Sequence, residues 1–190
     1  MKVNTKDQIR QKCWDRALEA FGTGYIFEKR ANKLRYQLRI LTFLGIFVPL
    51  IAGAIVLTFG QVVLSPFILI PAGILGIIQV VGSLWSLVAR WDDDYSYSIE
   101  SLNSNYRLSN NYQRLADNPP DSSSELQIQF DLLDREDEFR RAEDYKQAIS
   151  EKDKRKGMRA ALRKFKRQCV GCEQVPISMK STDCSICGQF

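Results

Sequence analysis

Apolar and polar positions along the chain separate into one long apolar block and charged segments on either side of it. From Ile40 to Ala89, fifty consecutive residues include no Asp, Glu, Lys or Arg. A helix that crosses a bilayer core of about 30 Å needs roughly 20 apolar residues, and the block supplies two such spans, 40–59 and 67–89. The residues between them that favour a turn are Gly60, Gln61, Ser65 and Pro66. The pattern predicts a transmembrane hairpin; the competing interpretation is a very apolar core hairpin, although such helices usually keep one polar face.

The flanking segments carry apolar residues at helical spacing. Residues 5–21 form an amphipathic helix by this pattern, and Gly22-Thr23-Gly24 is expected to break it before it resumes at 25–39 and leads into the first span. After the hairpin, helical spacing returns at 95–116, and the run NPPDSSS (118–124) is a second break. A further helix is expected from Glu125. The predicted chain is therefore helical except near its C-terminus.

Charges outside the hairpin fall into three blocks. Residues 1–39 carry 10 basic and 4 acidic side chains (+6), residues 90–150 carry 7 and 14 (−7), and residues 151–190 carry 10 and 4 (+6). Basic residues crowd the start of the first span and Arg90 follows the second, whereas the turn between the spans is uncharged. Because Lys and Arg near span ends stay on the cytoplasmic side, both termini are expected to be cytoplasmic.

Small and polar residues recur at steps of three or four along the second span and so share one helix face: Gly76, Gln79, Ser83, Ser86 and Arg90. An amide such as Gln79 is costly in lipid unless it is hydrogen-bonded. The face can therefore pack against another helix or line a water-filled path in an oligomer, as candidate pore-lining residues. Asp92, Asp93 and Asp94 follow; they suit a helix N-terminus, and several copies around an axis would form a cation-concentrating ring at a pore mouth.

Nine basic side chains crowd residues 152–167 around a narrow apolar stripe of Met158, Leu162 and Phe165. Such a segment can pair with the acidic stretch 131–144, lie on anionic lipid or contact nucleotide phosphates. The candidate ligand-binding residues are Lys154, Arg155, Arg159, Arg163, Lys164, Lys166 and Arg167. Charge alone leaves all three interpretations open, and the cysteine motif that follows favours phosphate.

Four of the five cysteines lie in the last 22 residues, as two CxxC pairs separated by eleven residues: Cys169, Cys172, Cys184 and Cys187. Two such pairs can offer four thiolates to one tetrahedral Zn²⁺, and four cysteines leave no open position for water, so the expected site is structural. Disulfides are the alternative, but a cytoplasmic location keeps thiols reduced. Residues 175–179 are a candidate strand of this zinc ribbon. Cys13 stands alone and is expected to be a small buried apolar residue.

No catalytic constellation accompanies these features. Histidine is absent, and neither a glycine-rich phosphate loop nor a nucleophile with a credible base is present. The chain is therefore not expected to be an enzyme.

The order of these features resembles a known family. An amphipathic segment with Trp14 and Arg16, the basic lead-in 25–39, two close spans and the helix YRLSNNYQRLA together resemble the SLATT domain. This is a bacterial two-transmembrane module linked to SMODS nucleotidyltransferases. The tail is similar to the CxxC-x11-CxxC arrangement of SLATT-related mobilome proteins.

The resemblance implies an inner-membrane effector of anti-phage defence that forms a pore and controls cell death in response to a nucleotide-derived signal. The membrane component of the Hailong defence system is similar in kind, and there the signal would be a short DNA oligomer. The implied partners are membrane lipid, further copies of the chain, a cyclic or short oligonucleotide ligand and a nucleotidyltransferase that makes it. Two spans cannot enclose an aqueous path, so a pore would need several copies, four or more.

The expected fold class is an all-α membrane protein that forms a homo-oligomer. Its parts are N-terminal cytoplasmic helices (1–39), a transmembrane hairpin (40–89), a cytoplasmic helical region (90–167) and a zinc ribbon (168–190). The leading functional hypothesis is a ligand-regulated pore, either opened or held closed by its ligand. The alternative is a membrane-anchored adaptor whose zinc ribbon recruits a protein or nucleic acid without forming a pore.

Overall fold

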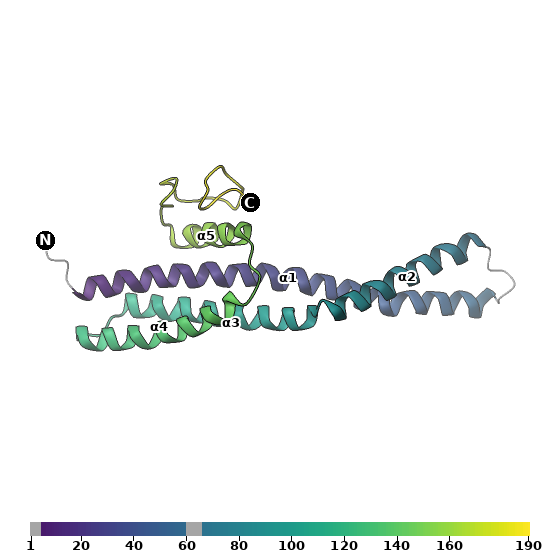
Figure 1. Cartoon of the computed structure of the whole chain (residues 1–190), viewed down its shortest axis with the longest axis horizontal. Coiled ribbons are helices and arrows are strands. Elements are labelled where there is room, and N and C mark those ends of the chain that lie inside the picture. Colours follow the sequence, from purple (N-terminus) through teal and green to yellow (C-terminus); the bar gives the residue numbers. More distant parts are fainter. Residues whose placement is uncertain (1–4, 60–65) are drawn as a thin grey trace. The chain divides into compact units, whose positions relative to one another are not determined.

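The computed structural model describes residues 5–59 and 66–190, which form five α-helices and a C-terminal loop (Figure 1). The helices are α1 (Thr5–Phe59), α2 (Pro66–Val88), α3 (Trp91–Asp117), α4 (Ser123–Tyr145) and α5 (Glu151–Phe165). The described residues contain no strand, which confirms the all-α prediction for them and makes the predicted strand at 175–179 wrong. Of the predicted turn residues, Pro66 begins α2, whereas Gly60, Gln61 and Ser65 lie outside the described residues.

The chain divides into two compact units. The first, here called the helical domain, combines Met1–Lys29 with Ser98–Phe190. The second, here called the hairpin unit, is Arg30–Tyr97.

The predicted break at Gly22-Thr23-Gly24 is wrong, because α1 continues through it. A Cβ atom at Gly22 would lie 3.2 Å from the Gly157 carbonyl oxygen of α5, and one at Gly24 would lie 2.6 Å from the Tyr106 ring of α3. Glycine disfavours a helix interior by about 1 kcal/mol relative to alanine. Here that preference is overridden by tertiary packing, since the missing side chains let α5 and α3 approach α1.

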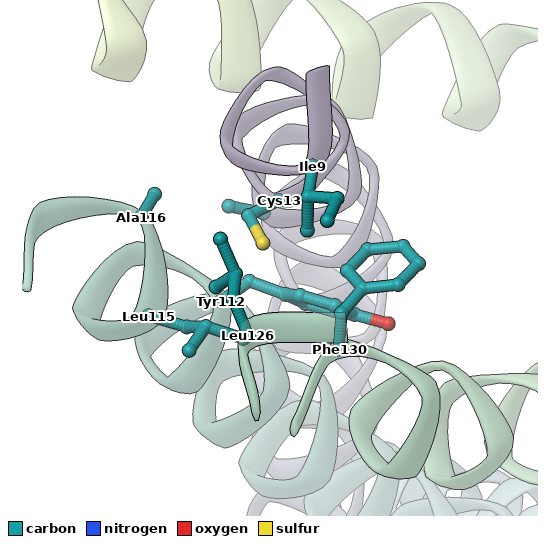
Figure 2. Packing of buried hydrophobic residues seen from close by; sticks show 8 residues of the cluster. Ile9, Cys13, Tyr112, Leu115, Ala116, Leu126 and Phe130 are labelled. Atoms are coloured by element: carbon teal, nitrogen blue, oxygen red, sulfur yellow. The ribbon is translucent and has the colours of Figure 1, made fainter. Parts of the chain in front are cut away.

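The core of the helical domain joins α1, α3 and α4 (Figure 2). Its buried members are Ile9, Cys13, Ala17, Tyr112, Leu115, Ala116, Leu126 and Phe130. Cys13 is fully buried, as predicted, and burial raises the pKa of its thiol to about 11. This thiol is therefore a small apolar packing group and not a reactive one.

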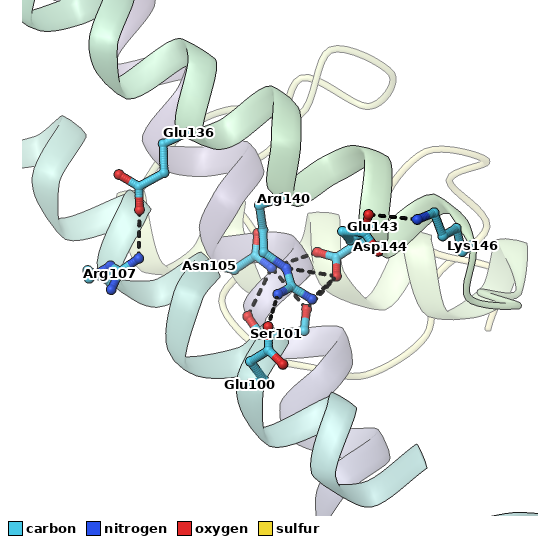
Figure 3. A network of polar contacts seen from close by, with 9 residues as sticks. All are labelled: Glu100, Ser101, Asn105, Arg107, Glu136, Arg140, Glu143, Asp144 and Lys146. Carbon is cyan, nitrogen blue, oxygen red and sulfur yellow. Dashed lines mark hydrogen bonds and ion pairs between the residues drawn. The ribbon is translucent and has the colours of Figure 1, made fainter. Parts of the chain in front are cut away.

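A buried polar network ties α3 to α4 (Figure 3). The Asp144 carboxylate accepts hydrogen bonds from Ser101 Oγ and Asn105 Nδ2, both at 2.8 Å. Arg140 donates to Asp144 at 2.8 Å and to Glu100 at 2.7 Å. A buried carboxylate is tolerated only when it is paired and hydrogen-bonded, and this network meets both conditions.

The acidic stretch 131–144 forms ion pairs with neighbouring helices as well as within α4. Asp134 pairs with Arg16 of α1 at 3.0 Å, and Glu136 pairs with Arg107 of α3 at 2.6 Å. These contacts orient α4 against α1 and α3, so this part of the acidic charge is already partnered inside the domain.

Two helices are long and apolar enough to cross a membrane, one within Thr5–Ile55 and the other over Ile70–Val88. No residue in the most apolar stretch of either helix is buried in the protein. A core helix of a soluble protein buries its apolar side chains, whereas here large ones such as Ile46 and Ile77 are about two-thirds exposed. The hairpin is thus evidence for association with a membrane.

Candidate metal centre

The two CxxC pairs lie in the loop after α5 and form matching turns. The Glu173 N–H donates to the Cys169 carbonyl at 2.8 Å, and the Gly188 N–H donates to the Cys184 carbonyl at 2.9 Å. At Gly188 a Cβ atom would lie 2.2 Å from the Thr182 carbonyl oxygen, so only glycine fits this close approach. Each turn aims its two thiols toward the other pair.

The four sulfur atoms gather at one point. All four Sγ atoms lie within 4.8 Å of one another. The Sγ atoms of Cys169 and Cys184 are 3.9 Å apart, and those of Cys172 and Cys187 are 3.8 Å apart. An ion with metal–sulfur distances of about 2.3 Å at the centre of a regular tetrahedron would have its ligands about 3.8 Å apart, whereas a disulfide needs about 2.05 Å. The cysteines are therefore compatible with a structural metal ion.

The pKa values of the thiols differ because their surroundings differ. Backbone N–H groups of Cys187 and Ile186 lower the pKa of the Cys184 thiol to about 6. Burial raises the pKa of the Cys187 thiol to about 12 in the metal-free chain. The Gly171 N–H also points at Cys169 Sγ, 3.4 Å away. N–H groups aimed at sulfur stabilise thiolates, which are the form that binds a metal.

The centre is fixed to the helical domain by a second, smaller core. Its buried members are Leu18, Ala161, Leu162, Cys169 and Cys187. Leu18 belongs to α1 and the two residues 161 and 162 belong to α5, so one cysteine of each pair packs against these two helices. Figure 1 shows the C-terminal loop lying beside α5.

Arg159 holds the part of the cysteine loop from Ser178 to Cys187 against α5. Its side chain is 6% exposed. Its Nε donates to the Ser178 carbonyl at 2.7 Å, and its Nη1 donates to the Cys187 carbonyl at 3.1 Å and to Thr182 Oγ1 at 3.3 Å. Its charge had placed Arg159 among the predicted ligand-binding residues. A signal for its role was available, since it lies three residues before Leu162 on the apolar side of a helix that directly precedes the cysteines.

The other predicted ligand-binding residues are distributed over the surface of α5 and the residues after it. Lys154 pairs with Glu151 at 2.7 Å, Arg155 donates to the Gln189 carbonyl at 3.2 Å, and Arg167 pairs with Asp15. Three more predicted residues are exposed to solvent: Arg163, Lys164 and Lys166. Arg159 thus points into the protein, whereas the exposed cations cluster at the C-terminal end of α5. Ligand binding by them stays a prediction.

Within the hairpin unit, the predicted polar face of α2 is divided. With its amide nitrogen facing the Leu44 carbonyl, Gln79 donates there at 3.2 Å and accepts from the Gly45 N–H at 3.3 Å. Ser86 is buried and Gly76 is partly buried, whereas Ser83 and Arg90 are exposed. The structure of one chain therefore packs part of this face against α1 and leaves the rest exposed.

The predicted pore-mouth carboxylates occupy the first turn of α3, where acidic residues complement the helix dipole. Asp94 pairs with Arg30 at 3.1 Å and Asp93 with Arg90 at 2.7 Å, while Asp92 is exposed. The structure thus places all three where a helix start favours them. Their role as a ring in an oligomer stays a prediction.

A comparison with known protein families found one family that matches the chain. A family described as mobilome CxxCx(11)CxxC protein matches residues 10–190, which is almost the whole chain. Comparisons with curated proteins and with solved structures found no match. The match includes both CxxC pairs with their spacing of eleven residues, and it extends over the hairpin, α2 to α5 and most of α1. The chain therefore belongs to the family of mobilome CxxCx(11)CxxC proteins.

Proposed function

We propose that the protein is a membrane effector of anti-phage defence, in which several copies of the hairpin form an ion-permeable pore and the helical domain receives a nucleotide-derived ligand. The exposed apolar surface of the hairpin supports a membrane location. The resemblance to SLATT modules supports the effector role. A pore needs several copies because two helices cannot surround an aqueous path.

The observation that carries the proposal is the exposed apolar surface of the hairpin, and the contact of Gln79 with α1 is compatible with it. The Leu44 carbonyl and the Gly45 N–H lie inside α1 and belong to its helical hydrogen-bond ladder. The bonds from Gln79 are therefore additional ones. They can be exchanged for water or for another copy without leaving a backbone group unpaired. A closed hairpin can therefore release this contact when the polar face of α2 lines an aqueous path.

We propose that the four cysteines hold Zn²⁺. Four thiolates at tetrahedral spacing are typical of a structural zinc site, which has no open position for a substrate. The ion would link the two CxxC pairs, and one cysteine of each pair packs against α5 and Leu18. A loop of this size has little core of its own, so metal binding supplies part of its folding free energy.

The ligand would bind at the exposed end of α5, through Arg163, Lys164 and Lys166. Phosphate contacts from Lys and Arg supply most of the affinity for a single-stranded oligonucleotide, and each lost contact lowers the salt dependence by about 0.7 in log–log slope. Reversing these three charges is expected to abolish oligonucleotide binding, whereas Lys12→Glu, an exposed change on α1, is the matched control. Unchanged affinity in the triple variant would exclude this ligand surface.

Ion flux from liposomes tests the proposal. Full-length, metal-loaded protein is reconstituted and flux is measured with and without short DNA oligomers and cyclic oligonucleotides. Flux is expected under one of these conditions. Gln79→Leu, which keeps the side-chain size but removes the amide bonds, is expected to shift the balance between conducting and closed states. The absence of flux under every condition would overturn the proposal.

A membrane-anchored adaptor is the second candidate, and one observation favours it. Gln79 and Ser86 pack inside a single hairpin, and a Cβ atom at Gly82 would lie only 3.3 Å from the Leu41 side chain. Close helix contact at small residues is the ordinary way in which membrane helices pack. An adaptor predicts that the protein binds a partner through its helical domain and that liposomes stay sealed.

A further inference from the structure

Helix α4 carries apolar side chains on the side opposite its core face. Ile128, Leu132 and Phe139 are 61%, 61% and 72% exposed, whereas Leu126 and Phe130 are buried. The spacing of four and seven residues places the three exposed side chains on one face of the helix. We call these three residues the outer face of α4. An exposed apolar row of this kind indicates a contact surface.

The charges beside the outer face decide which partner suits it. Asp131 and Glu138 are exposed on one flank of the row and Glu136, which pairs with Arg107, on the other, while Arg135 is exposed within the row. A second α4 helix would place acidic flanks beside each other, which the single Arg135 of each helix offsets only in part. A suitable partner surface is instead apolar with basic residues beside it.

The same chain carries such a surface next to its metal centre. A pocket of about 490 Å³ opens between α1, α5 and the first CxxC turn. Its apolar lining consists of Leu18, Met158, Leu162, Val170 and Ile186. We call this the cysteine-loop pocket. Its volume lies in the range of cavities that enclose small ligands, so an aromatic side chain fits in it. Val170 at its edge is 88% exposed.

Basic residues stand beside this pocket. Arg167 lines it, and Lys164 and Lys166 are exposed in the segment that leads into it. Two acidic residues, Asp15 and Glu19, also line the pocket, but they pair with Arg167 and Arg16 respectively. Lys164 and Lys166 thus add basic charge in the segment next to the pocket, opposite in sign to the flanks of α4.

We propose that Phe139 of one copy docks into the cysteine-loop pocket of a second copy, with the acidic flanks of α4 facing Lys164 and Lys166. The contact joins two different surfaces of the same chain, so it is heterologous, and repetition of such a contact closes a ring or extends a filament. The membrane spans hold all copies in one bilayer, which favours a ring. This deepens the proposed function by naming the surfaces through which the copies of an oligomeric effector meet.

Photocrosslinking tests the contact in full-length protein in membranes. Phe139 is replaced by the photoreactive p-benzoylphenylalanine, which reacts readily with methionine side chains, and Met158 lines the pocket. Irradiation is expected to give a crosslinked dimer whose joined peptide contains Met158 or a neighbouring pocket residue. The same photoreactive residue at Asn110, which is exposed on α3, is the matched control. A crosslink to another region, to lipid or to another protein, or no crosslinked dimer, would overturn the proposal.

A charge exchange gives a second, independent readout. Copies with Asp131→Lys and Glu138→Lys, and separately copies with Lys164→Glu and Lys166→Glu, are each expected to lose about tenfold of the crosslinked dimer, because like charges then face each other. Co-expression of the two variants under different tags is expected to restore the crosslink between unlike copies only. No recovery between them would contradict the proposed pairing.

The two proposals can fail separately. Sealed liposomes together with the Met158 crosslink would reject the pore and retain the contact between copies. Ion flux that persists in Phe139→Asp, without any crosslink at the pocket, would reject the contact and retain the pore.

Discussion

Replacement of Arg159 by alanine should loosen the cysteine loop from α5 and weaken metal binding. The side chain makes three hydrogen bonds to the loop, to the Ser178 and Cys187 carbonyls and to the Thr182 hydroxyl. Hydrogen bonds from a charged group contribute about 1.5–3 kcal/mol each, and a carbonyl left buried without a partner costs about 1–3 kcal/mol. Water can replace part of this loss. We therefore expect a cost of about 3 kcal/mol, which corresponds to roughly 100-fold weaker metal affinity.

Competition with a chromophoric chelator measures this effect on the full-length protein in detergent. Arg163→Ala is the matched control, since Arg163 lies on the same helix and is exposed. Far-UV circular dichroism checks that the helices of both variants remain folded. Arg159→Lys should fall between alanine and the wild type, because it keeps the charge but cannot reach all three acceptors. Wild-type affinity in Arg159→Ala would refute the role assigned to this residue.

Three further predictions concern the helical domain. Gly24→Ala should lower the free energy of unfolding by about 1–3 kcal/mol, because its Cβ would lie 2.6 Å from an aromatic ring. Thermal unfolding measures this loss, and Gly53→Ala is the control because nothing lies within 4 Å of a Cβ atom at that position. Asp144→Asn should cost about 3 kcal/mol, because it removes the acceptor charge of a buried ion pair, whereas Glu143→Gln should change denaturant unfolding little. Thiol titration at pH 8 should detect four cysteines once a chelator is added, because the loop loses its structure without the metal and then exposes the buried Cys169 and Cys187. The fifth, Cys13, lies in the core of the helical domain, where burial raises its pKa to about 11, so it should react only after the helices unfold; reaction of all five while the helices remain folded would contradict this.

Features with a local signal were predictable from the sequence. The spacing of the cysteines predicted the cluster, because each CxxC turn places its two thiols close together in a defined geometry. The break at 118–124 was confirmed, since α3 ends at Asp117 and α4 begins at Ser123. The buried state of Cys13 followed from its place on an apolar helix face.

Features that depend on a distant partner were not predictable. Gly22 and Gly24 resemble a helix break, and only the approach of α5 and α3 turns them into packing positions. The role of Arg159 depends on carbonyl groups about 20 to 30 residues further along the chain. Likewise, the polar face of α2 was recognised, but its division between a packed Gln79 and an exposed Ser83 required the position of α1.

Electrical recording across a planar bilayer tests the central proposal most directly. Purified, metal-loaded protein is added to a bilayer under voltage, with and without a short DNA oligomer. Discrete current steps are expected in one of these two conditions, with a changed open probability in Gln79→Leu. A bilayer that stays silent in both conditions, with protein shown to be inserted and folded, would contradict the pore and leave the adaptor as the function to pursue.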